Sequence, residues 1–146
     1  MALADELQNR IAERLRLALG LMETSVITSS SSEYDIRNSV SRIYYAFFHA
    51  SVALLLATDE DIEKVRKNHG MLHERIQRKF GTTMIITRLI RELYDLRREC
   101  DYEANMFVRK YRGNIEEARK DTILLIERAK PQFFWIYNQA RQFLSK

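Results

Sequence analysis

The sequence predicts an all-α fold in a single domain. Only 4 glycines and 1 proline occur among its 146 residues, and so few turn-forming residues favour a handful of long helices over a sheet. Apolar residues also recur every three or four positions over long segments, which is the spacing of one helix face. A chain of this length fits one domain and can bury a sizeable core.

The composition, 46% hydrophobic and 30% charged, argues against disorder. Cys100 is the one cysteine, so an internal disulfide is excluded and a reducing cytoplasm is the simpler setting. The charged N-terminal residues lack the apolar core of a signal peptide. The most apolar stretch, 43–57, is too short to span a bilayer and carries His49 and Ser51, so we expect a buried helix and no membrane contact.

Charge and motifs narrow the classes of function. The net charge of +4, from 24 basic and 20 acidic residues, is compatible with a phosphate-rich partner but would aid encounter more than specificity. No glycine-rich phosphate loop occurs, which argues against a Walker or Rossmann site. No GxSxG or Cys–His signature of a hydrolase occurs either. Pro131 and the aromatic clusters argue against a long coiled coil.

Four helices are expected before residue 103. A first helix over about 4–24 is followed by a polar loop rich in serine, and a second helix, the expected central element, covers about 33–57. A short third helix, about 68–80, is closed by Gly81, and a fourth covers about 83–102.

The C-terminal part is less regular. Residues 101–113 fit either a frayed helix or a loop. The last helix should begin near Asn114, which with Glu117 resembles a capping box. Pro131 is expected to kink or break it, because proline lacks the N–H and clashes with the preceding turn. The residues after the proline are apolar enough to pack back on the bundle: Phe133, Phe134, Ile136, Tyr137 and Phe143.

The first group of residues that could carry out chemistry pairs Arg42 with His49. Because the two residues are seven positions apart, they lie near one stripe of a helix, about 10.5 Å apart along the axis, with Tyr45 between them. An arginine beside a histidine suits phosphate chemistry, because arginine can clamp the oxygens while histidine moves a proton. Alternatively, Arg42 pairs with a carboxylate and His49 is a satisfied core residue, which is the commoner role for a lone helix pair.

The second constellation follows Lys67. His69 and His73 share a helix face, but no HExxH motif and no further ligands accompany them, so we expect no metal and no cofactor. The nearby basic residues form either a solvated helix face, which these residues alone favour, or a surface that tracks phosphates. They are Lys64, Arg66, Lys67, Arg75, Arg78 and Lys79.

The third constellation contains two i, i+4 pairs, Arg97 with Asp101 and Arg98 with Tyr102. An Asp–Arg pair of this kind most often locks a helix end. Its functional alternative is an arginine that a carboxylate holds in position for a phosphate.

These three segments together resemble the motifs of small stand-alone HEPN proteins (higher eukaryotes and prokaryotes nucleotide-binding). Residues 41–50, SRIYYAFFHA, resemble the R-x-YYAxFHA signature, and KNHG at 67–70 resembles the following K-x-H element. LRRECDY at 96–102 resembles the LRxxADY element, with Cys100 in place of alanine. The three occur in the order found in the family, and the similarity covers about residue 33 to the C-terminus.

The resemblance implies an up-and-down bundle of four long helices plus a short one, commonly dimeric. Family members often act as RNA-cleaving toxins or as partners of small nucleotidyltransferases. Active members cleave RNA without a metal through an R-x4–6-H motif: the 2′-hydroxyl attacks the adjacent phosphate, histidine assists proton transfer and arginine stabilises the developing charge.

The family's catalytic motif does not carry over directly, because the positions expected for histidine after Arg97, 102–104, hold Tyr, Glu and Ala. Arg42 and His49 match the spacing, but on the earlier helix. The chain therefore either uses a composite site or only binds. Tyr102 could correspond to the tyrosine that nucleotidyltransferases modify in related toxins. The catalytic candidates are Arg42, His49, Arg97 and Asp101, and the substrate-binding candidates are Tyr45, Lys67, His69, His73 and Tyr102.

The sequence thus predicts a cytoplasmic, homodimeric, HEPN-like protein that acts on RNA or nucleotides. We expect one half of a toxin–antitoxin or nucleotidyltransferase pair, with metal-independent endoribonuclease activity as one outcome. The alternatives are a non-catalytic module that binds a nucleotide or supports a partner enzyme, and a protein–protein adaptor. The composite site further predicts that the side chains of Arg42, His49 and Arg97 converge on one cleft.

Overall fold

The computed structural model describes residues 4–58, 68–81 and 84–144, and within these ranges it contains helices and no strand. The prediction of an all-α bundle is therefore confirmed. The helices are α1 (Asp5–Glu23), α2 (Glu33–Thr58), α4 (His69–Phe80), α5 (Ile85–Tyr102), α6 (Met106–Tyr111) and α7 (Ile115–Arg141). The four helices expected before residue 103 agree with the structure to within two residues at each end.

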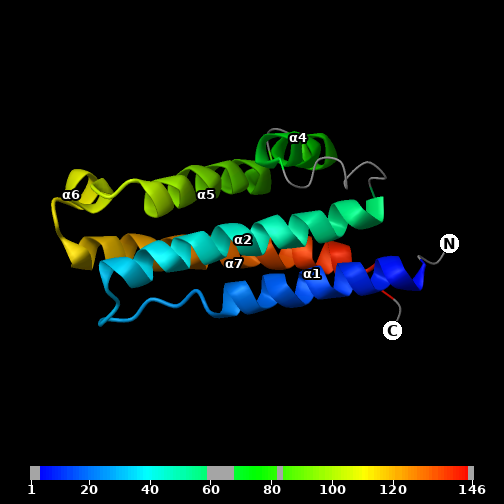
Figure 1. The fold of residues 1–146 in the computed structure, drawn as a ribbon, viewed down its shortest axis with the longest axis horizontal. Helices are drawn as coiled ribbons and strands as arrows, with labels where there is room; N and C mark the ends of the chain where they lie inside the picture. The colour runs from blue at the N-terminus through cyan, green and yellow to red at the C-terminus, as the bar shows by residue number, and fades with distance from the viewer. Residues whose placement is uncertain (1–3, 59–67, 82–83, 145–146) are drawn as a thin grey trace.

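The four long helices α1, α2, α5 and α7 lie side by side and alternate in direction along the chain (Figure 1). The arrangement is an up-and-down bundle. Helix α2 is its centre, because it packs against α1, α5 and α7. The short helix α4 lies against α5 at one end of the bundle, and α6 lies at the other end (Figure 1). The described residues thus contain two short helices, where one was expected.

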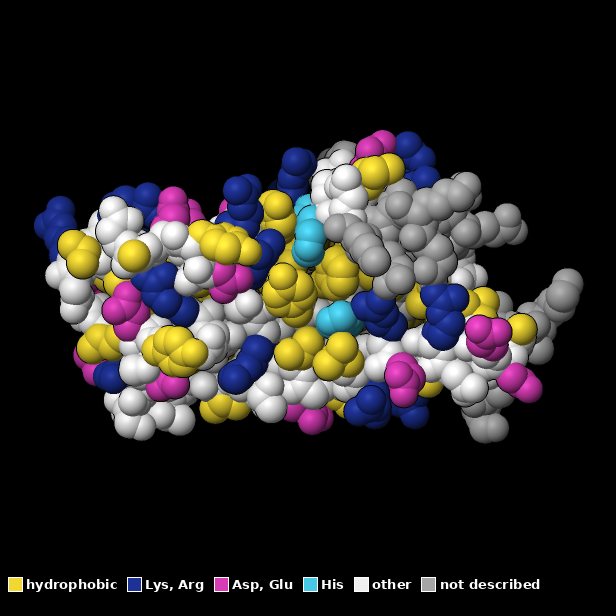
Figure 2. All heavy atoms as spheres, viewed as in Figure 1, with side chains coloured by type: hydrophobic (Ala, Val, Ile, Leu, Met, Phe, Trp, Pro, Cys, Tyr) yellow, Lys and Arg dark blue, Asp and Glu magenta, His cyan; other side chains and the backbone are white. Residues whose placement is uncertain are grey.

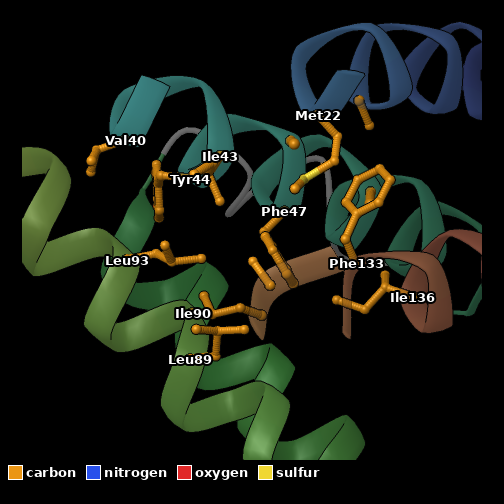
Figure 3. Packing of buried hydrophobic residues seen from close by; sticks show 14 of the residues in the cluster. Met22, Val40, Ile43, Tyr44, Phe47, Leu89, Ile90, Leu93, Phe133 and Ile136 are labelled. Atoms are coloured by element: carbon orange, nitrogen blue, oxygen red, sulfur yellow. The ribbon is translucent and has the colours of Figure 1, made fainter. Parts of the chain in front are cut away.

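The core forms where α5 and α7 meet the apolar side of α2 (Figure 3). Phe47 of α2 and Phe133 of α7 are fully buried, and their rings meet edge to face with centroids 5.8 Å apart. Such aromatic pairs contribute about 0.5–1.5 kcal/mol beyond the burial of their area. Around them lie further buried apolar side chains from four helices: Ile11, Met22, Ile43, Tyr44, Leu89, Ile90, Leu93 and Ile136.

Helix α2 is long and apolar enough to cross a membrane by length and composition alone. In the bundle, however, 67% of its most apolar window is buried against the other helices. This is the behaviour of the core helix of a soluble protein, and it agrees with the buried helix expected from the sequence.

Two side-chain caps fix the starts of α4 and α7. Asn68 Oδ1 accepts a hydrogen bond from the Met71 amide at 3.1 Å, and Asn114 Oδ1 accepts one from the Glu117 amide at 3.2 Å. Each bond satisfies an amide that has no partner within its helix. Gly81 ends α4 with a φ of +88°, a backbone conformation that glycine adopts without strain. The predicted starts and the predicted stop are confirmed.

Helix α7 continues through Pro131, so the break that the sequence allowed does not occur. Proline inside a helix costs about 3 kcal/mol, and tertiary packing must offset this cost. This packing comes from three side chains that are fully buried on the side of α7 facing the bundle: Ala129, Phe133 and Ile136. The residues after the proline therefore pack on the core as part of the same helix.

The segment that was ambiguous in the sequence, 101–113, contains the additional short helix α6. Arg37 of α2 holds the turn between α5 and α6, because its guanidinium donates to the carbonyls of Cys100 (2.7 Å), Glu103 (3.0 Å) and Ala104 (3.1 Å). The guanidinium also lies 5.2 Å from the centre of the Phe107 ring. These contacts join positions more than 60 residues apart, so local sequence could not reveal them.

Candidate functional site

A buried tyrosine hydroxyl joins two of the predicted histidines. Tyr44 of α2 is 1% exposed, and its hydroxyl lies 2.6 Å from His69 Nδ1 and 3.2 Å from His73 Nε2. The two histidines are four residues apart on α4, so their imidazoles leave the same face of that helix. Tyr44 belongs to the core stripe of α2, and a buried phenol needs a hydrogen-bond partner. Packing of α4 on the bundle brings that partner to it.

Arg97 of α5 lies among three tyrosine rings beside these histidines. Its Cζ atom is 5.2 Å from the ring centre of Tyr44, 5.6 Å from that of Tyr45 and 5.2 Å from that of Tyr94. Cation–π attraction stabilises the guanidinium in this position. We call Tyr44, His69, His73, Tyr94 and Arg97 the Tyr44 cluster.

Arg97 is unusually buried for a charged residue, at 6% exposure. Its Nη1 atom lies 3.5 Å from Asp101 Oδ2, so the predicted i, i+4 pair is present. Its Nε atom is buried and has no hydrogen-bond partner in the described part of the chain. A buried donor without an acceptor costs about 1–3 kcal/mol. An anion bound at Arg97 would remove this cost.

The surroundings keep both histidines of the cluster uncharged at neutral pH. Burial, followed by the influence of the nearby His69, lowers the pKa of His73 to about 4. Burial also lowers the pKa of His69, with the positive charge of Arg97 as the second cause. Burial raises the pKa of Tyr44, so its phenol stays protonated. The cluster therefore offers neutral imidazoles, which can accept or donate a proton, beside a permanent positive charge.

His49 lies further along α2 and is held by a different arginine. Arg14 Nη1 of α1 lies 2.7 Å from His49 Nδ1, and because a guanidinium can only donate, Nδ1 is the acceptor. Burial, followed by the charge of Arg14, lowers the pKa of His49 to about 4. Arg14 also lines a hollow of about 330 Å³ between α1 and α2, together with Arg10, Arg16, Val52 and Leu56 among others.

Tyr45 is half-buried and connects His49 to the Tyr44 cluster. Its ring centre lies 6.4 Å from that of His49, 6.4 Å from that of His69 and 5.6 Å from Arg97 Cζ. Figure 2 shows two histidine surfaces on one face of the molecule, with hydrophobic side chains between them and basic side chains around them. The structure thus brings together most of the predicted site from α2, α4 and α5.

The remaining predicted residues lie differently. Arg42 is exposed and donates to the carbonyl of Thr24 just after α1 (3.5 Å), so this contact takes its guanidinium to the end of α1 and not to the Tyr44 cluster. A positive charge at a helix C-terminus is favourable in its own right. Tyr102 is 76% exposed near the end of α5. Lys67 lies outside the described residues.

Sequence reasoning missed Tyr44, Tyr94 and Arg14. Tyr44 carried a usable signal, because a residue with a polar tip in the buried stripe of a helix requires a partner. Arg14 carried none, since it reaches a histidine 35 positions away. No group of three or more His, Cys, Asp or Glu side chains in the described ranges is placed to hold a metal ion.

Fold and site together define an all-α bundle in which a buried tyrosine and a buried arginine lie beside two half-buried histidines, between the central helix, α4 and α5. Comparison of the chain with protein-family models, with curated proteins and with solved structures found no match. The resemblance to the HEPN family therefore remains a prediction that rests on the three sequence motifs.

Proposed function

We propose that this protein acts on RNA as an HEPN-like, metal-independent endoribonuclease, with a backbone phosphate bound at Arg97. The observation that carries the proposal is the buried Nε donor of Arg97, which has no described acceptor and lies beside neutral imidazoles. A phosphate oxygen is an acceptor that matches the guanidinium fork. The surrounding tyrosine rings and Asp101 would hold the guanidinium ready before the phosphate arrives.

The reaction needs a base, an acid and charge stabilisation. The base takes the proton of the 2′-hydroxyl, the bond from O2′ to phosphorus forms, and the bond from phosphorus to O5′ breaks. The acid protonates O5′, which leaves a 2′,3′-cyclic phosphate and a 5′-hydroxyl. Imidazoles that are neutral at pH 7 can serve as the base, and Arg97 can stabilise the negative charge on the phosphate oxygens.

The test is incubation of the purified protein with a single-stranded RNA oligonucleotide in EDTA, followed by analysis of the fragment ends. We expect cleavage that EDTA does not abolish and fragments that end in a cyclic phosphate. Cleavage should be lost in Arg97→Ala and His69→Ala. It should persist in Arg128→Ala, which removes the same charge from an exposed ion pair with Glu92. Retained cleavage in Arg97→Ala would contradict the proposal.

A second candidate is a non-catalytic module that binds a nucleotide or supports a partner enzyme. Both imidazoles of the cluster already contact Tyr44, so one nitrogen of each is engaged within the protein, which favours this candidate over catalysis. Saturable RNA or nucleotide binding without cleavage, lost in Arg97→Ala, would support this candidate. An absence of both binding and cleavage would leave a protein–protein adaptor.

The partner and setting proposed with this function are a small nucleotidyltransferase, a homodimer and the cytoplasm. The exposure of Tyr102 would allow a modifying enzyme to reach it. Incubation with a nucleotidyltransferase encoded by a neighbouring gene should add nucleotide mass to the protein but not to Tyr102→Phe. Light scattering at several protein concentrations would test the dimer.

A further inference from the structure

The contacts of the Tyr44 hydroxyl restrict the protons of both histidines. The oxygen lies within hydrogen-bond distance of His69 Nδ1 and His73 Nε2. A protonated phenol has one O–H donor and can accept at its lone pairs. It can therefore donate to one imidazole and accept from the other, but it cannot donate to both.

Two arrangements of neutral imidazoles satisfy this restriction and also give the Tyr44 O–H an acceptor. A third, in which both imidazoles donate to the oxygen, would leave the buried O–H without an acceptor among the described residues. In the first, Tyr44 donates to His69 Nδ1 and His73 Nε2–H donates to Tyr44, so both imidazoles carry their proton on Nε2. In the second, His69 Nδ1–H donates to Tyr44 and Tyr44 donates to His73 Nε2, so both carry their proton on Nδ1. The two imidazoles thus share one tautomer in either arrangement.

We propose that Tyr44 joins His69 and His73 into a proton relay that takes up a proton at one imidazole and releases one at the other. Starting from the second arrangement, His69 Nε2 accepts a proton from the substrate. The Nδ1 proton of His69 moves to the Tyr44 oxygen, the original Tyr44 proton moves to His73 Nε2, and His73 Nδ1 gives its proton away. One proton enters, one leaves, and the cluster ends in the first arrangement.

The relay suits this site because no imidazolium needs to persist. Arg97 places a permanent positive charge beside the rings of Tyr44 and Tyr94. Arg91 adds to the positive charge felt by His73, and Asp95 opposes it. A second cation close to the buried charge of Arg97 would be unfavourable, whereas the relay keeps both imidazoles neutral before and after the transfer.

In the proposed reaction the relay would supply both proton transfers. One imidazole would take the proton of the 2′-hydroxyl while the other protonates the departing O5′. This use of the relay rests on the proposed function, but the shared tautomer does not. The two claims can therefore fail separately.

Nuclear magnetic resonance of the imidazole nitrogens tests the relay without any substrate. In the wild-type protein we expect His69 and His73 to carry their protons on the same type of nitrogen. In Tyr44→Phe the imidazole nitrogen that accepts from the hydroxyl loses its hydrogen bond. Its resonance should move to the chemical shift of a nitrogen without a hydrogen bond. Tyr94→Phe is the matched control, because its ring centre lies 5.7 Å from that of His69 and 4.9 Å from that of His73 while the described hydrogen bonds run to Tyr44. Opposite tautomers in the wild type, or no shift in Tyr44→Phe, would overturn the relay.

Kinetics then tests how the relay is used. Tyr44→Phe should lower the rate of RNA cleavage by about 100-fold, the lower range for loss of general acid–base catalysis, while the Kd for RNA changes less than about threefold. The cleavage rate can also be measured in mixtures of H2O and D2O. A curved decrease of this rate with the D2O fraction would show that several protons move in the transition state, which a structural role of Tyr44 would not produce. If the resonances show the shared tautomer but no RNA is cleaved, the proposed function fails, whereas the hydrogen-bond chain through Tyr44 stands. Unchanged cleavage by Tyr44→Phe would overturn its use in the reaction.

Discussion

Replacement of Arg97 by methionine should separate the stability of this protein from its function. Methionine has a similar length and no charge, so it can fill the space between the tyrosine rings. We expect Arg97→Met to keep the free energy of unfolding within about 1 kcal/mol of the wild type, or to raise it. RNA or nucleotide binding should be lost in the same variant.

The magnitude follows from two opposing effects. The substitution removes cation–π contacts to three rings, worth about 2 kcal/mol together in a desolvated site, and an ion pair with a carboxylate that is 29% exposed, worth at most about 1 kcal/mol. It also removes a buried Nε donor without a described partner, which costs the folded protein about 1–3 kcal/mol. The two effects nearly cancel.

Urea denaturation, monitored by circular dichroism, measures the difference in the free energy of unfolding between Arg97→Met and the wild type, with Arg98→Met as control. Arg98 is exposed and its Cζ lies 5.7 Å from the Tyr94 ring centre, so the control removes an equal charge from the same helix. A loss of more than about 3 kcal/mol in Arg97→Met would refute the reasoning, because it is the cost expected when an essential buried charge pair is broken. Arg97 would then be a structural residue.

Three further predictions follow from the remaining contacts. The folded pKa values of His49 and His73, each about 4, lie below the ordinary 6.5, so the unfolded chain binds more protons between about pH 4 and 6.5. The free energy of unfolding should therefore fall as the pH drops through this range. The urea midpoint should fall less steeply with pH in His73→Gln than in the wild type. An equal dependence of the midpoint on pH in the two proteins would contradict the lowered pKa of His73. In Arg14→Met the pKa of His49 should rise from about 4 toward 6.5, although burial will keep it below that value, and an NMR titration would detect a failure to move. Asn114→Ala should cost about 1 kcal/mol in urea unfolding, while Asn105→Ala should cost less because Asn105 makes no side-chain cap bond to α6; similar losses would argue against the cap.

The helices were predictable because their signals are local. Apolar spacing places α1, α2, α4 and α5, and Asn114 and Gly81 mark boundaries through contacts within four residues of themselves. The sequence left 101–113 open between a frayed helix and a loop, because the turn before α6 is held by Arg37, more than 60 positions away. Pro131 was judged by a local rule, whereas burial of Phe133 and Ile136 keeps α7 continuous.

The candidate site was predictable in part for the same reason. The pair Arg97 and Asp101 and the pair His69 and His73 are local helix relationships, and both are present. The link between them is Tyr44, which only the packing of α4 against α2 and α5 creates. Arg42 was assigned by spacing along α2, but the nearby end of α1 offers its guanidinium a carbonyl.

Burial gives the Tyr44 cluster both its cost and its chemistry. Water around His69 and His73 would bring the pKa of each imidazole back toward 6.5 and leave a mixture of charged and neutral rings at neutral pH. Partial burial lowers the pKa of both imidazoles and favours their neutral form, whereas the nearly complete burial of Arg97 confines its charge and leaves its Nε donor without a described acceptor. Burying a cation is unfavourable unless some anion compensates it, and Asp101, with Oδ2 at 3.5 Å, does so only in part. A helical bundle could fill the same space with apolar side chains at no such cost, so the buried charge of Arg97 supports the proposal that an anion binds there.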